Sequence, residues 1–69
     1  MTVIYTQEHC PMCDVLKTAL KNNNIDFVEE KDVDLMLSLG ITKTPMLHVD
    51  DQPDLLNLKS ALNWIEEKR

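Results

Sequence analysis

The sequence predicts a single α/β domain over residues 1–69, with a four-stranded mixed sheet and three helices on both of its faces. The first observation is that the apolar residues change from strand-like runs to helical spacing and back. The second is that a helical segment separates the first two strands, which makes them parallel, whereas a short turn separates the last two, which makes them antiparallel. The third is size, because 69 residues that are 43% hydrophobic support only one small core. Function must therefore lie at the surface or in a loop.

The first half of the chain is predicted to form a strand, a helix and a second strand. Residues 3–6 (Val-Ile-Tyr-Thr) are β-branched or aromatic, which is typical of a strand. Pro11 fits the first position of a helix, where its missing N–H is not needed, and the polar run 22–24 ends that helix. The apolar residues between them lie at helical spacing: Met12, Val15, Leu16, Ala19 and Leu20. Residues 25–30 then predict the second strand.

The second half is predicted to form a short helix, two strands and a last helix. Asp32 can cap the short helix, and Gly40 can end it. Residues 45–49 form the third predicted strand and residues 55–56 (Leu-Leu) a short fourth one. Asn57 then caps the last helix. The inward positions of the two helices are Val33, Met36 and Leu37, and then Leu58, Ala61, Leu62 and Ile65.

The charge of the chain disfavours two classes of partner. Asp and Glu total 12 against 7 Lys and Arg, so the net charge is −5 and the pI is about 4.7. Binding to nucleic acid or to an anionic membrane needs clustered basic residues, whereas these are scattered singly. No apolar run approaches the roughly 20 residues of a membrane span, and the N-terminus lacks the features of a signal peptide. We therefore expect a cytoplasmic protein that binds neither nucleic acid nor membrane, and we expect a monomer.

The most informative motif is Cys10-Pro11-Met12-Cys13, which follows a predicted strand and opens a predicted helix. Cytosolic thiols are kept reduced, so such a pair is typical of catalysis or metal binding and not of a structural disulfide. Unpaired amides and the dipole at a helix N-terminus favour the thiolate and lower a cysteine pKa. Cys10, at the N-cap of this helix, lies among these amides and is therefore the expected attacking thiolate. Cys13, one turn further, is the expected resolving thiol that breaks the mixed disulfide.

Two other functions remain open for the cysteine pair. One is a metal or iron–sulfur binding module, for instance across a dimer. Structural zinc usually needs four ligands, but only His9 and His48 accompany the cysteines, without a paired spacing. We therefore predict no bound metal. The other is a non-catalytic interaction domain whose cysteines only sense redox state, and which forms the disulfide without turnover.

Together these residues resemble the glutaredoxin branch of the thioredoxin-like family. The similarity rests on Tyr5-Thr6 before the Cys-x-x-Cys motif, on Lys17, and on Thr44-Pro45 at the start of the third predicted strand. It implies a thioredoxin-like fold, dithiol–disulfide oxidoreductase activity, and a cis peptide bond before Pro45, beside the cysteines. It also implies a substrate-binding role for four residues: Tyr5, Met12, Thr44 and Pro45.

The chain departs from the family pattern at the start of its last helix. Glutaredoxins usually carry Gly-Gly followed by Asp there to hold glutathione, whereas residues 54–59 contain no glycine. Small hydrogen donors of ribonucleotide reductase, which thioredoxin reductase recycles, also lack those glycines, but their Trp-Ser-Gly-Phe segment is absent here as well. The resemblance therefore implies a disulfide-containing protein substrate, ribonucleotide reductase being one candidate, with glutathione or thioredoxin reductase as electron donor.

No bound cofactor is expected, and glutathione enters only as a co-substrate. An anion can settle on the amides of Leu58 and Lys59 at the start of the last helix, with added charge from Lys43 and Lys59. We nevertheless expect glutathione to bind weakly, because side chains stand where glycines would allow close approach.

Two basic side chains are candidates for tuning the thiolate. His9, next to Cys10, could stabilise it as an imidazolium. Lys17, one turn beyond Cys13, could lower the cysteine pKa or meet a substrate carboxylate. Each has a plainer interpretation, as a solvated loop histidine and an exposed helix lysine.

Overall fold

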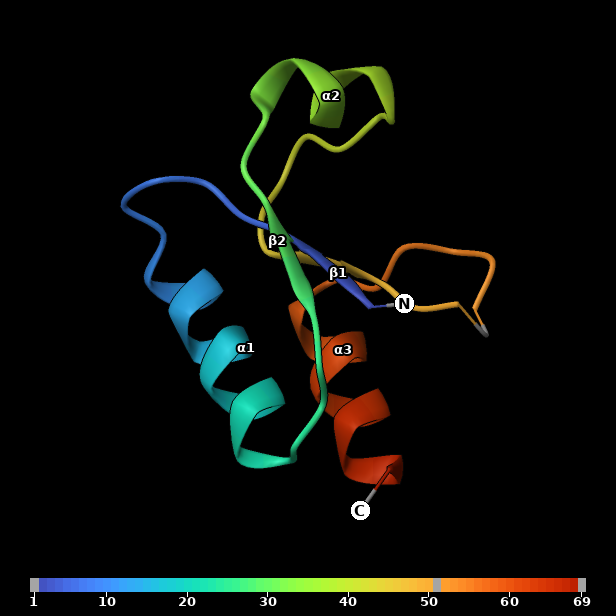
Figure 1. Cartoon of the computed structure of the whole chain (residues 1–69). Coiled ribbons are helices and arrows are strands. Elements are labelled where there is room, and N and C mark those ends of the chain that lie inside the picture. The colour runs from blue at the N-terminus through green and yellow to red at the C-terminus, as the bar shows by residue number, and fades with distance from the viewer. Residues whose placement is uncertain (1, 51, 69) are drawn as a thin grey trace.

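The computed structural model describes residues 2–50 and 52–68. Within the described residues, three short strands and three helices alternate along the chain, and Figure 1 shows how they are arranged. In chain order they are β1 (Val3–Tyr5), α1 (Pro11–Asn22), β2 (Val28–Glu30), α2 (Val33–Ser38), β3 (Met46–His48) and α3 (Leu58–Glu67). The predicted helix starts at Pro11 and Leu58 are confirmed, because each helix begins directly after its predicted cap.

The sheet is mixed and has β1 at its centre, in the order β2-β1-β3. Strand β1 pairs in parallel with β2, as predicted, and antiparallel with β3. In this register Ile4 lies between Glu29 on one side and Leu47 on the other. The two outer strands therefore lie on opposite sides of β1, which separates the side chains of β2 from those of β3.

The prediction of a fourth strand is wrong. Leu56 pairs with Leu47 through two backbone hydrogen bonds of 2.8 Å, but this remains an isolated bridge and not a strand. The physical reason is the shortness of the apolar pair. Pro53 precedes it closely, and Asn57 is already occupied as the cap of α3. One residue of the predicted strand is therefore left to pair, and the sheet of the described residues has three strands.

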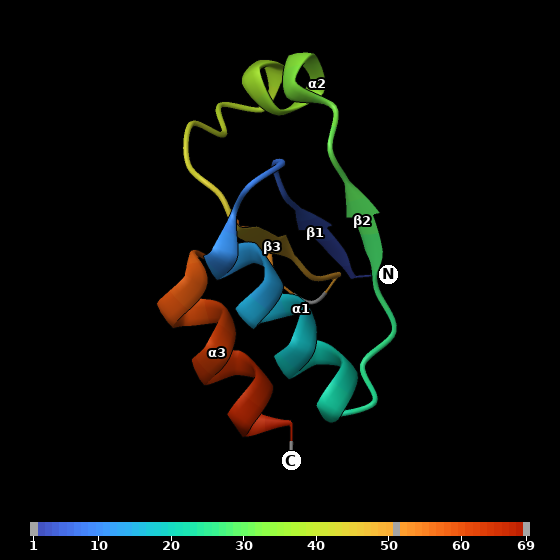
Figure 2. The same ribbon diagram turned by 90° about the vertical axis from the view of Figure 1, so that its left-hand side faces the viewer.

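The core lies between the sheet and the pair of long helices. Helices α1 and α3 pack side by side (Figures 1 and 2). Their buried residues join those of the strands in one cluster: Ile4, Leu16, Leu20, Leu47, Val49, Ala61 and Ile65. Helix α2 has only six residues and lies beyond the end of β2, away from α1 and α3, in both views. The prediction that helices cover both faces of the sheet is therefore only partly right. Helix α2 is too short to cover a face and lies at one end of the sheet.

Candidate active site

The loop after β1 delivers Cys10 to the beginning of α1. Backbone φ at His9 is 57°, in the left-handed region, and Cys10 then takes an extended conformation as the N-cap. The Cys13 N–H donates to Cys10 Sγ over 3.1 Å. Pro11 has no N–H of its own to satisfy at this position. The cap of this helix is therefore a sulfur atom, and the helix N-terminus directs an amide at it.

The two cysteines form a disulfide in the structure, with their Cα atoms 5.2 Å apart. They differ in exposure, because Cys13 is 1% exposed whereas Cys10 is only partly buried. An attacking thiol or thiolate in solution can therefore approach the sulfur of Cys10 and not that of Cys13. This difference agrees with the predicted division of labour, which remains a prediction.

Thr44 and Pro45 lie beside the disulfide, although they are more than thirty residues away in sequence. Their peptide bond is cis, which confirms the geometry implied by the family resemblance. The Thr44 Oγ1 atom lies 3.7 Å from Cys10 Sγ and 3.5 Å from Gln7 Oε1. Gln7 was not predicted as a site residue, because its contact is with Thr44, 37 residues away in sequence.

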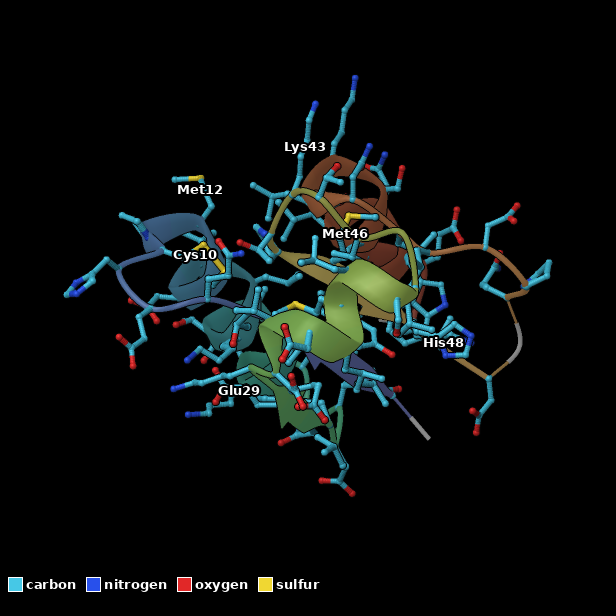
Figure 3. All side chains as sticks on the ribbon, turned by 90° about the horizontal axis from the view of Figure 1, so that it is seen from above. Cys10, Met12, Glu29, Lys43, Met46 and His48 are labelled. Carbon is cyan, nitrogen blue, oxygen red and sulfur yellow. A yellow bond between two sulfur atoms is a disulfide. The ribbon has the colours of Figure 1, made fainter. Side chains whose placement is uncertain are left out.

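A groove opens beside Pro45 and brings together the starts of α1, β3 and α3. Its volume is about 340 Å³, and we call it the Pro45 groove. Its apolar residues are Met12, Pro45, Met46 and Leu58, and its other lining residues are Lys43, Thr44, Asn57 and Lys59. Figure 3 shows Cys10, Met12, Lys43 and Met46 at the same end of the molecule. Three of the four predicted substrate-binding residues line this groove, but Tyr5 does not.

The predicted tuning residues do not contact Cys10 in the structure. The Lys17 ammonium donates to Glu29 Oε2 over 3.0 Å and lies 3.5 Å from Asp14 Oδ1. His9 is exposed. Lys17 therefore links α1 to β2 through its ion pair with Glu29.

Glu29 is the partner that sequence reasoning missed. The Thr6 hydroxyl, 1% exposed, donates to Glu29 Oε2 over 2.8 Å. The hydrogen bonds from Lys17 and then Thr6 lower the pKa of Glu29, and the bond to Glu29 raises the pKa of Lys17. We call Thr6, Lys17 and Glu29 the Glu29 network. It joins the end of β1, α1 and β2 immediately behind the cysteine loop.

Two features are absent from the part of the chain that the structure describes. Within the ranges 2–50 and 52–68, no three His, Cys, Asp or Glu side chains gather closely enough to hold a metal ion. No helix in the same ranges is long and apolar enough to cross a membrane.

Comparison with known proteins agrees with a thiol–disulfide redox centre at the two cysteines. The glutaredoxin family model matches residues 2–53, which is most of the chain and includes both cysteines and Pro45. No curated protein and no solved structure matches. The matched length, the α/β sheet order and the cysteine pair at the start of α1 agree with one another. The chain belongs to the glutaredoxin family and has a thioredoxin-like α/β fold with a thiol–disulfide redox centre.

Proposed function

We propose that the protein is a thiol–disulfide oxidoreductase that reduces disulfides of other proteins. In the reduced protein, the Cys10 thiolate attacks one sulfur of the substrate disulfide and releases the other sulfur as a thiolate, which takes up a proton. The Cys13 thiol then loses its proton and attacks Cys10 Sγ in the mixed disulfide. The products are the substrate dithiol and the Cys10–Cys13 disulfide, so two electrons pass from protein to substrate.

The single observation that carries this proposal is the asymmetry of the disulfide. Cys10 Sγ is accessible and accepts the Cys13 N–H, so a thiolate at this atom is stabilised by an oriented amide. Cys13 is buried directly beside it. One sulfur is therefore placed to attack a partner, and the other to attack only the mixed disulfide.

The start of α3 favours a protein or a reductase over glutathione as the main partner. Asn57 Oδ1 already accepts the Ser60 N–H over 2.9 Å, so one of the amides that could hold a carboxylate is occupied. Leu56 and Asn57 also carry side chains where glycine would leave the backbone open. We therefore propose that thioredoxin reductase or an equivalent protein donor regenerates the dithiol more efficiently than glutathione does.

A coupled turnover assay tests both parts of the proposal. The protein is given a protein disulfide substrate and either glutathione with glutathione reductase or thioredoxin reductase, each with NADPH. We expect turnover, and faster turnover with thioredoxin reductase. Turnover with glutathione alone would refute the choice of donor, and no turnover with either donor or with dithiothreitol would refute the enzymatic function.

A further inference from the structure

The Pro45 groove combines an apolar lining with exposed positive charge. Its apolar residues are Met12, Pro45, Met46 and Leu58, whereas Lys43 and Lys59 are both exposed. Within residues 2–50 and 52–68, no carboxylate lies within ion-pair distance of either lysine. By contrast, Lys17 is bound to Glu29, and Lys68 lies over the Trp64 ring at 5.3 Å.

This positive charge stands out because the protein as a whole is acidic. The chain has 7 basic residues and a net charge of −5, yet two of the 7 line the groove that adjoins the reactive disulfide. Local charge of the opposite sign to the bulk selects partners and raises their rate of encounter. The charge around the groove is therefore complementary to carboxylates on a partner.

The apolar lining sets a second requirement on that partner. Met12 and Met46 flank the groove, and unbranched thioether side chains adapt to different apolar shapes. Glutathione has carboxylates but no apolar side chain to fill this space. A segment that uses both features must carry an apolar side chain and an acidic one close to its cysteine.

We infer that the Pro45 groove selects disulfide-bonded protein segments in which the cysteine adjoins a large apolar residue and has Asp or Glu within about two further positions. The apolar side chain packs on Met12, Met46 and Leu58, and the carboxylate approaches Lys43 and Lys59. This inference rests on the proposed function, because the bound segment presents its disulfide to Cys10. It adds the class of substrate that the site accepts.

The test uses disulfide-linked dimers of four short peptides. Each peptide has Leu or Ser beside its single cysteine, and Glu or Lys two residues away. The fully reduced protein is mixed with each dimer, and the single-turnover rate is followed by chromatography of the released thiol. We expect the Leu-Glu peptide to react fastest, by roughly three- to fivefold over the Leu-Lys peptide at low ionic strength. This preference must shrink in 0.5 M salt, because screening weakens exposed charge pairs.

Variants of the groove lysines and of Met12 identify the residues that set the preference among the four peptides. Lys43→Glu and Lys59→Glu should each reduce or reverse the ratio of the Glu-peptide rate to the Lys-peptide rate. Lys21→Glu, at the far end of α1, changes the net charge equally and should leave that ratio and the basal rate unchanged. Met12→Gln should reduce the ratio of the Leu-peptide rate to the Ser-peptide rate.

Several outcomes would overturn the inference. They are equal rates for all four peptides, a preference for the Lys peptides, an equal response to Lys21→Glu and Lys43→Glu, or faster reduction of glutathione disulfide than of the best peptide.

The rate with hydroxyethyl disulfide, a small neutral substrate, separates this inference from the proposed function. If the protein reduces it but does not discriminate among peptides, only the selectivity is wrong. If it reduces no disulfide at all, the proposed function fails as well.

Discussion

The two sides of the disulfide use lysine in opposite ways. On the β2 side, Lys17 is bound by Glu29, which also accepts the hydroxyl of Thr6. On the β3 side, Lys43 and Lys59 line an apolar groove without a carboxylate partner in the described part of the chain. In the view of Figure 3, Lys43 lies above Cys10 and Glu29 below it. The comparison indicates that charge on the first side holds elements together, whereas charge on the second side is left available for a partner.

The largest expected effect comes from the cysteines, which lie at the boundary between the two sides. Cys10→Ser should abolish reduction of disulfides, because Cys13 is 1% exposed and cannot reach a substrate. Cys13→Ser should keep the attack but accumulate a mixed disulfide on Cys10, because the resolving thiol is absent. Mass spectrometry of each variant after incubation with a peptide disulfide measures the adduct. An adduct on Cys13 of the Cys10→Ser protein, at the wild-type rate, would reverse the two roles.

The next effect tests the groove side through the hydroxyl of Thr44. Its Oγ1 atom lies 3.7 Å from Cys10 Sγ and is placed to stabilise a thiolate there. Thr44→Val should slow alkylation of the reduced protein by iodoacetamide by roughly two- to tenfold, the equivalent of about 0.5–1.5 kcal/mol for one hydrogen bond. Thr42→Val, at an exposed position of the same loop, is the matched control and should react as the wild type does. Equal rates for the two variants would show that Thr44 does not act on Cys10.

Local sequence signals predicted the parts of the structure that depend on neighbouring residues. The caps at Cys10, Asp32 and Asn57 are confirmed, because each side chain accepts an N–H three residues later. The predicted fourth strand failed because pairing depends on what lies opposite, and only Leu56 meets a partner. Such long-range pairing is not contained in a run of two apolar residues.

The candidate site was predictable to a similar extent. The cysteines and Pro45 follow from motifs, but the ion pair of Lys17 with Glu29 was not predicted, because Glu29 was overlooked. A signal for Glu29 existed: it lies two residues after Phe27, which packs against the core, so strand alternation places both on the face toward α1. Gln7 had no such signal, since it lies in the loop after β1 and contacts Thr44, 37 residues away in sequence.

The third prediction concerns the β2 side and measures stability. The Thr6 hydroxyl is buried and donates to Glu29 Oε2 over 2.8 Å. Thr6→Val keeps the shape but removes this bond, so it should lower the free energy of unfolding by about 1 kcal/mol. In a domain of this size the melting temperature should fall by roughly 4–8 °C. The peptide preferences of the Pro45 groove should not change, whereas a loss of selectivity without a loss of stability would contradict the separation of the two sides.

The smallest effect is the pH dependence of the same network. Because the folded-state pKa of Glu29 is lowered from its usual value of 4.5, its charge stabilises the fold above pH 4.5, and this contribution is lost as the pH falls through the lowered value. The pKa of Lys17 is raised from 10.5, so its contribution is present below pH 10.5 and is lost as the pH rises through the raised value. Between these limits the contribution is constant.

Glu29→Gln isolates this contribution, because the amide oxygen still accepts a hydrogen bond but carries no charge. Denaturant unfolding at a series of pH values should show the variant less stable than the wild type by a small, constant amount between pH 5 and 10. The difference should shrink as the pH falls from 4.5 and close as it passes through the lowered pKa of Glu29, since the carboxylate of the folded wild type becomes protonated there. Glu66→Gln, at an exposed position of α3, is the control and should show no such profile.

Both members of the Lys17–Glu29 pair reach solvent, so salt should also reduce the difference. A difference that widened at acidic pH would mean that the carboxylate of Glu29 opposes folding, and the β2 side would then not be the side where charge holds elements together.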